Sequence, residues 1–231
     1  MNASAIKTLL RMHWVNVRLS IRIFWAILLF VGVLAFALVS IFGNAERTNV
    51  NTSAIAAITI YLLVSSLIVV SETFPLALGM SFRRKDYYAS AVLLLTGLTL
   101  AFTTVSWLLM VIEQRIAEWL GVRVTVFTVG DKGQISVTDQ LSLYLGAGLF
   151  VIAVGFFLGL LHYRFGKTGV LTAAGIFLVL IVLLHLGGGN PLVEWYRAAG
   201  SLKGFMATLL IPAALLFGAG YPLTLRMGAK G

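Results

Sequence analysis

Long apolar runs separated by short polar segments constrain this chain more than any other feature. We expect each run to cross a membrane, at approximately residues 23–42, 54–71, 89–112, 141–161, 169–186 and 205–225. Each run is near the roughly 20 residues that a helix needs to cross a hydrocarbon core about 30 Å thick. Backbone groups in lipid must hydrogen-bond within their own segment, so the runs should be helices. The expected fold class is an all-α polytopic membrane protein with six transmembrane helices.

Charged residues are scarce in this sequence. They make up 11% of the 231 residues, whereas about a quarter of the residues in soluble domains are charged. Lipid should therefore surround most of the surface, and we expect residues 1–231 to form a single transmembrane domain. Cysteine is absent, which excludes disulfides, thiolate nucleophiles and cysteine-ligated metals.

The net charge of +9 would suggest nucleic acid as a partner of a soluble protein. In this chain the positive charges are divided unevenly between the two sides of the membrane. With a cytoplasmic N-terminus, eleven Lys and Arg and two acidic residues face the cytoplasm, against six of each sign outside. Cytoplasmic loops of membrane proteins carry an excess of Lys and Arg. We expect a multi-pass plasma-membrane protein with both termini cytoplasmic, in contact with lipids and not with nucleic acid.

Residues 2–22 fit an amphipathic helix before the first run. Cations share one side of this helix and apolar residues an adjoining arc: Lys7, Arg11, Arg18 and Arg22 against Ile6, Leu10, Val17 and Ile21. One interpretation is an interfacial helix whose cations reach anionic lipid headgroups. Another is an elbow helix that also contacts a cytoplasmic partner.

Residues 72–88 form a short polar bridge between the second and third runs. Pro75 can occupy the first turn of a short helix that Gly79 ends, and Ser81 can cap the next span. Arg83, Arg84 and Lys85 follow as three consecutive cations. We expect a cytoplasmic helix over residues 73–86 that another protein can contact. The alternative is that these cations only set topology and anchor lipid.

The largest exterior segment is residues 113–139. Residues 113–120 suit a short helix, and residues 122–129 alternate in the manner of a strand. A turn at residues 130–133 would let residues 134–138 pair back, so we expect a small β-hairpin outside the membrane. A second short outer helix is expected over residues 190–200, before the sixth span.

The spans themselves offer packing and path residues. Gly155 and Gly159 have GxxxG spacing, which brings helices close together either within the subunit or between subunits. Aromatic and hydroxyl side chains could line a path for an amphipathic substrate, among them Phe102, Thr103, Trp107, Phe156 and Phe157. Lipid-facing or packing roles are the simpler interpretation of any one of them.

The sequence shows no spacing of His or carboxylate residues that is typical of a catalytic site. The three His have no metal-ligand spacing, and we expect no metal site and no catalytic residues. No carboxylate falls in mid-membrane, where it would mark an ion path. Glu72 and Glu113 fall at span ends, where solvation explains them.

The layout of the whole chain resembles the permease subunits of type-2 ATP-binding-cassette exporters. Six spans, a basic amphipathic N-terminal helix and a short interior helix between spans two and three are shared features. The segment from Phe74 and Pro75 to Gly79, followed by Phe82, Arg83, Arg84, Lys85 and Asp86, is similar to the coupling region of small bacterial members. The resemblance implies a bacterial, non-catalytic transport subunit.

The resemblance also implies partners. Two copies of a separate ATPase subunit would dock on residues 74–86 and on the N-terminal helix, and would bind the ATP and Mg²⁺. This chain itself would bind no cofactor. A second permease copy would complete a homodimer or a related heterodimer. The expected function is efflux of a hydrophobic or amphipathic molecule such as a peptide, drug or lipid.

Two functions from other classes remain open. A non-transporting receptor or immunity protein would bind its ligand through the exterior hairpin. An intramembrane enzyme would gather polar residues at one membrane depth.

Overall fold

The computed structural model describes residues 3–42, 50–51, 54–120, 124–127, 137–186 and 201–226. The helices are α1 (Ala3–Phe42), α2 (Ala54–Gly79), α3 (Arg84–Leu120), α4 (Val137–Leu186) and α6 (Leu202–Arg226), and the strands are β1 (Val50–Asn51) and β2 (Val124–Thr125). Within the described residues, five helices are long and apolar enough to cross a membrane. The prediction of a helical multi-pass membrane protein is therefore confirmed.

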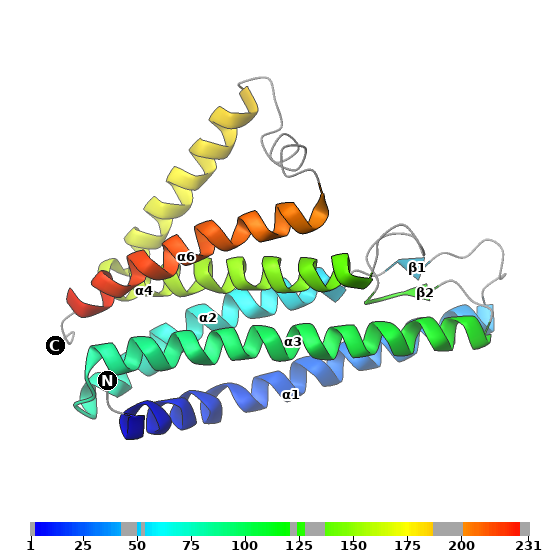
Figure 1. The fold of residues 1–231 in the computed structure, drawn as a ribbon, viewed down its shortest axis with the longest axis horizontal. Coiled ribbons are helices and arrows are strands. Elements are labelled where there is room, and N and C mark those ends of the chain that lie inside the picture. The colour runs from blue at the N-terminus through cyan, green and yellow to red at the C-terminus, as the bar shows by residue number, and fades with distance from the viewer. Residues whose placement is uncertain are drawn as a thin grey trace.

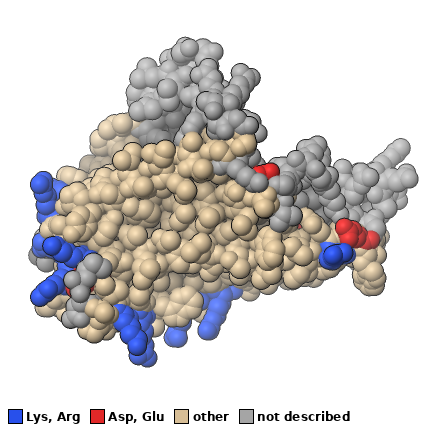
Figure 2. All heavy atoms as spheres, in the orientation of Figure 1, with Lys and Arg blue, Asp and Glu red and all other residues tan. Residues whose placement is uncertain are grey.

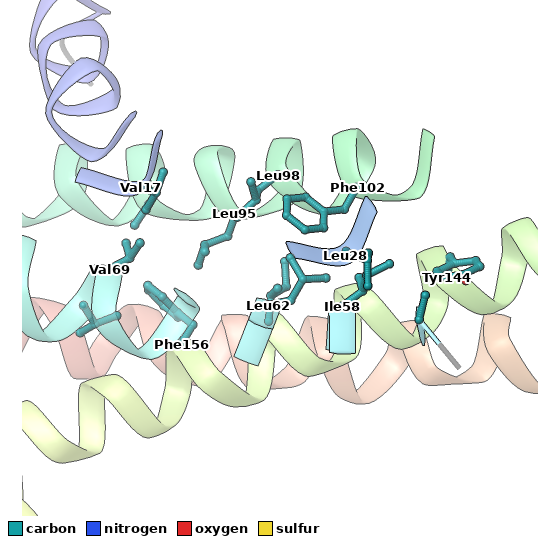
Figure 3. Close-up of a cluster of buried hydrophobic side chains, with 14 of the residues drawn as sticks. Val17, Leu28, Ile58, Leu62, Val69, Leu95, Leu98, Phe102, Tyr144 and Phe156 are labelled. Atoms are coloured by element: carbon teal, nitrogen blue, oxygen red, sulfur yellow. The ribbon is translucent and has the colours of Figure 1, made fainter. Parts of the chain in front are cut away.

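The helices form an elongated bundle (Figure 1). Here α1 runs alongside α3, α4 packs against α2 and α6, and α2 contacts α1, α3 and α4. The core lies along this bundle, where side chains from α1 to α4 meet (Figure 3). Phe102 of α3 stacks on Tyr61 of α2, and Tyr61 stacks on Phe24 of α1, with ring centroids 5.2 and 4.4 Å apart. This aromatic stack joins three helices.

The N-terminal helix does not end at residue 22. α1 is one uninterrupted helix of 40 residues, about 60 Å long. Its buried residues Leu9, His13 and Val17 continue at helical spacing into Leu28 and Val39. The same stripe packs throughout the length of α1, so the prediction of a separate elbow helix over residues 2–22 is wrong.

The bridge between the second and third spans is not a separate helix. α2 continues through Pro75 to Gly79, and residues 80–83 turn directly into α3. The amides of Ser81 and Phe82 donate to the carbonyls of Leu78 and Ala77, at 3.0 and 3.1 Å. This pattern is a Schellman motif. Its left-handed residue is Ser81, with φ 59°, rather than the predicted Gly79.

The predicted hairpin over residues 122–138 is not supported. Residues 113–120 continue α3, and β2 pairs in parallel with β1, Val50 opposite Val124. The Phe127 amide donates to Glu113 Oε2 at 2.7 Å, and Tyr144 donates to the Phe127 carbonyl at 2.8 Å. These bonds hold the segment after β2 against α3 and α4. Residues 128–136 lie outside the described residues.

The fourth and fifth predicted spans both lie in α4, whose two helical parts meet at a kink. Among the described residues, five helices and not the predicted six are long and apolar enough to cross a membrane. α4 has a kink at Gly166, whose φ of 68° and ψ of −157° are not helical. Beyond Gly166 the distal part of α4 leaves the bundle (Figure 1). The residues between these two predicted spans, 162–168, are helical on both sides of this kink, because only Gly166 departs from helical geometry.

The last helix begins at a polar cap. Ser201 Oγ accepts a bond from the Gly204 amide at 3.0 Å, which satisfies a donor that the first turn of α6 leaves unpaired. The predicted short helix over residues 190–200 lies outside the described residues.

Candidate functional site

The turn between α2 and α3 carries the densest group of cations. A recess of about 550 Å³ opens there, and its walls are formed by Leu78, Ser81, Phe82, Arg83, Arg84, Lys85 and Leu225. We call Ser81 to Lys85 the cationic turn. Arg83 and Lys85 are exposed, and neither forms an ion pair with another described residue. Lys and Arg gather at this end of the molecule (Figure 2).

Arg84 ties the cationic turn to the last helix. Its guanidinium donates to the Leu225 carbonyl at 2.9 Å, across 141 residues of chain. Leu225 lies in the last turn of α6, whose carbonyls have no helical partner and carry partial negative charge. A charged donor is a favourable cap for such a group. Arg84 therefore fixes the end of α6 beside the start of α3.

Aromatic side chains support the cationic turn from below. Phe74 is fully buried and meets the rings of Tyr87 and Tyr163 edge to face, at centroid distances of 4.9 and 4.8 Å. The Tyr87 hydroxyl lies 3.1 Å from Thr73 Oγ1 and donates to the Val69 carbonyl at 3.2 Å. Edge-to-face pairs add to the stabilisation from burial alone. α2, α3 and α4 are thus packed together directly beneath the turn.

The first half of α1 joins the same unit. His13 Nε2 lies 3.2 Å from Ser90 Oγ of α3, and the His13 ring meets Tyr87 edge to face at 5.4 Å. Asn16 donates to Glu72 Oε2 of α2 at 3.0 Å. These polar contacts on α1 fall within the segment that the sequence assigned to a separate interfacial helix.

The predicted coupling residues occupy two environments. Pro75, Gly79, Arg83 and Lys85 are exposed, whereas Phe74 and Asp86 are buried and Phe82 and Arg84 are half-buried. Asp86 is in the first turn of α3, where a carboxylate is favoured by the helix dipole. The exposed members can contact a partner, and the buried members hold the turn in place.

The predicted path residues lie in different environments. Phe102, Thr103 and Phe156 are buried within the bundle, while Trp107 is 37% exposed on the outer side of α3. Phe157 is half-buried on α4. Phe156 packs against Tyr88 and Phe217 at 5.8 Å in each case, so its contacts are those of a core residue.

Gly155 and Gly159 lie where α4 approaches α2 within the same chain. A Cβ atom at Gly155 would lie 2.5 Å from the Leu63 carbonyl oxygen, and one at Gly159 would lie 2.9 Å from Val70 Cβ. These distances are shorter than side chains tolerate, so the two helices meet through their backbones.

The sequence pattern missed one ionisable residue. Glu113 is only 4% exposed and lies inside α3, seven residues before its end, rather than at a solvated span end. A signal was present in the apolar residues Ile112, Ile116 and Ala117, which continue the helical pattern past Glu113. The contact that buries Glu113 comes from Phe127, which no local pattern indicates.

No group of His, Asp and Glu with the arrangement of a metal site occurs among the described residues. Comparisons with protein-family models, with curated proteins and with solved structures found no match for this chain. Among the described residues, the cationic turn combines exposed charges with a fixed backbone.

Proposed function

We propose that this chain is the transmembrane subunit of an ATP-driven exporter of the type-2 ATP-binding-cassette class. A separate ATPase subunit would dock on the cationic turn and drive efflux of a hydrophobic or amphipathic molecule. The observation that carries the proposal is the combination of exposed Arg83 and Lys85 with a rigidly held Arg84 between them. Exposed charges suit a docking contact, and a fixed backbone can transmit force.

The connections of the turn support a mechanical role. A displacement of the turn would act on α6 through Arg84, on α4 through Phe74 and Tyr163, and on α1 through Ser90 and His13. Packed elements move together because interiors are dense and transmit strain. Movement imposed at one exposed turn would therefore reach every other long helix.

The proposal includes six membrane crossings with both termini in the cytoplasm. In Figure 1, α1 begins and α6 ends at the same end of the molecule, which an even number of crossings requires. The distal part of α4, residues 167–186, extends about 30 Å and could cross on its own. The cations at the end with the cationic turn favour the cytoplasmic side of a bacterial plasma membrane.

The proposed assembly contains two copies of the ATPase, which bind ATP and Mg²⁺, and a second permease copy. The chain contributes no catalytic residue in this proposal. Its role is to convert closure of the ATPases into movement of its helices.

The first prediction tests docking. Reversing the exposed charges with Arg83→Glu and Lys85→Glu should abolish co-purification of an ATPase with the tagged chain, because opposed like charges cost several kcal/mol at an interface. Arg84 and Phe82 are left intact because they hold the turn. Pull-down from native membranes with mass spectrometry measures the outcome.

The matched control reverses Arg164 and Lys167, which are equally exposed near the kink of α4. This variant should retain the ATPase. If the native chain brings down no ATPase, the proposed function is wrong. Specific ligand binding by a chain without an ATPase would favour the receptor function.

A further inference from the structure

A groove of about 440 Å³ lies between α3 and α6, at the end of the bundle where α3 begins and α6 ends (Figure 1). We call it the α3–α6 groove. Its volume is within the range of about 300–1,000 Å³ typical of sites for small molecules. The groove opens to the outside of the bundle, because Leu93 and Tyr221 in its walls are 56% and 38% exposed. The described lining residues are Lys85, Tyr88, Ala89, Val92, Leu93, Thr96 and Tyr221.

The lining residues of α3 share one face of this helix. They follow one another from Lys85 to Thr96 at the spacings of three and four residues that make neighbours on a helix surface. This length of helix rises about 16 Å, which is about half of a hydrocarbon core roughly 30 Å thick. The groove therefore has the depth of one leaflet, with Lys85 at its polar end and Thr96 toward the membrane midplane.

Two tyrosines form the walls of the groove near Lys85. The Tyr88 hydroxyl donates to the Phe217 carbonyl of α6 at 2.6 Å, and this bond ties α3 to α6. The rings of Tyr88 and Tyr221 meet edge to face, with centroids 5.2 Å apart. Tyr side chains favour the membrane–water interface, where an apolar ring and a polar hydroxyl are both accommodated. The polar end of the groove is thus preformed at the level of the lipid headgroups.

The charge at this end selects among the amphiphiles of that leaflet. Lys85 is the one charged residue in the described lining, and Arg83 and Arg84 precede it in the cationic turn. The nearest acid in sequence, Asp86, is buried and does not line the groove. A cation above an apolar slot complements a phosphate above an acyl chain, and lipids of the cytoplasmic leaflet are partly anionic. A cationic headgroup would be repelled by the turn.

We propose that the α3–α6 groove binds an anionic phospholipid of the leaflet on the side of the cationic turn. The phosphate pairs with the Lys85 ammonium, and one acyl chain lies along Ala89, Val92 and Leu93 toward Thr96. Lys85 also lines the recess at the cationic turn, so the bound headgroup borders the surface proposed for ATPase docking. The lipid site itself rests on the groove and not on the proposed function.

The preference is tested by native mass spectrometry on the purified full-length chain without an ATPase. The probes are phosphatidylglycerol, which is anionic, and phosphatidylcholine, which is zwitterionic, with identical acyl chains. From an equimolar mixture the native chain should retain about fivefold more of the anionic lipid, the contribution of one Lys beside an anionic headgroup. Lys85→Gln removes that charge and should bring the ratio close to one. An unchanged ratio in this variant would overturn the proposal.

Arg83→Gln is the matched control for charge. It removes an exposed cation of the same turn that lines the recess but not the groove. This variant should keep the lipid ratio of the native chain. An equal loss of preference in both variants would show that the lipid responds to the total charge of the turn, and would refute the groove as its site.

A second pair of variants tests the apolar part of the groove without touching Lys85. Ala89→Leu places a larger side chain in the lining and should lower the amount of bound phosphatidylglycerol about fivefold. Gly97→Leu is the control, because the Cβ position of Gly97 is open and lies on α3 outside the lining. Native levels of bound phosphatidylglycerol in Ala89→Leu would place the lipid elsewhere and refute the site.

The outcome is separable from that of the proposed function. Loss of the lipid preference in Lys85→Gln and of bound lipid in Ala89→Leu, in a chain that never associates with an ATPase, would keep the lipid site and reject the exporter. A chain that associates with an ATPase but retains both lipids equally would keep the exporter and reject the lipid site.

Discussion

Ser81, Arg84 and Glu113 show how single residues set the properties of this molecule. Ser81 adopts a left-handed conformation that ends α2, and Arg84 caps the last turn of α6. Glu113 holds the amide of Phe127 inside the bundle. Each residue joins segments that are distant in sequence or reverses the chain direction. Substitution at these positions should therefore have effects that exposure alone would not suggest.

The second prediction concerns the end of α2. A non-glycine residue in the left-handed region carries a cost of about 1–2 kcal/mol, so Ser81→Gly should raise the free energy of unfolding by about 0.5–1 kcal/mol. Gly79→Ala should also stabilise the chain by up to about 1 kcal/mol, since Gly79 is helical and its Cβ position is open. Thermal unfolding in detergent measures both.

The pair of variants distinguishes two structures of the turn. If Gly79 were the left-handed residue, as the sequence pattern suggested, alanine there would lower the midpoint of unfolding. A lower midpoint for either variant would contradict the Schellman motif seen at Ser81.

At the scale of elements, local sequence patterns predicted helices well and their connections poorly. The first span was expected to end at residue 42 and the second to begin at residue 54, and α1 and α2 do so. An apolar run indicates that its residues are buried, either in lipid or in the protein core. Both kinds of burial occur along the same helix. The N-terminal half of α1 buries Leu9 and Val17 against other helices. An amphipathic pattern does not show whether its apolar side faces lipid or protein, so the continuity of α1 was missed.

The candidate site was predictable to a similar extent. The run of cations is visible in the local sequence, so Arg83 to Lys85 were identified. The bonds from Arg84 to Leu225 and from Phe127 to Glu113 were not, because each depends on tertiary packing. The pairing of β1 with β2 joins segments on either side of two helices, which likewise has no local signal.

The third prediction tests the contact between α2 and α4. Gly155→Ala places a Cβ atom 2.5 Å from the Leu63 carbonyl oxygen, which belongs to the backbone and cannot rotate away. The helices must separate, and overpacking of this kind costs about 1–3 kcal/mol. We expect a lower midpoint of thermal unfolding in detergent. Gly218→Ala is the control, because the Cβ position of Gly218 on α6 is open, and this variant should unfold no earlier than the native chain. Equal midpoints for the two variants would refute the close approach.

On the scale of the whole molecule, the kink at Gly166 decides which face of the membrane α6 starts from. If the distal part of α4 crosses the membrane, Ser201 lies outside and Arg226 in the cytoplasm. If it does not cross, the two positions would exchange sides, and the bond from Arg84 to the Leu225 carbonyl could not form. In the orientation proposed above the cationic turn is cytoplasmic in both cases, so the two topologies differ only after Gly166.

The last prediction measures that difference. The chain has no cysteine, so single cysteines placed at Lys85, Glu118, Ser201 and Arg226 report position without a background signal. A membrane-impermeant maleimide applied to intact cells should label the variants at Glu118 and Ser201. It should reach those at Lys85 and Arg226 only after permeabilisation. The exposed Lys85 and Glu118 at the two ends of α3 serve as internal references, since α3 crosses in either topology. Labelling at Arg226 but not at Ser201 in intact cells would show five crossings. An odd number of crossings would contradict the proposal that α6 ends in the cytoplasm beside the cationic turn.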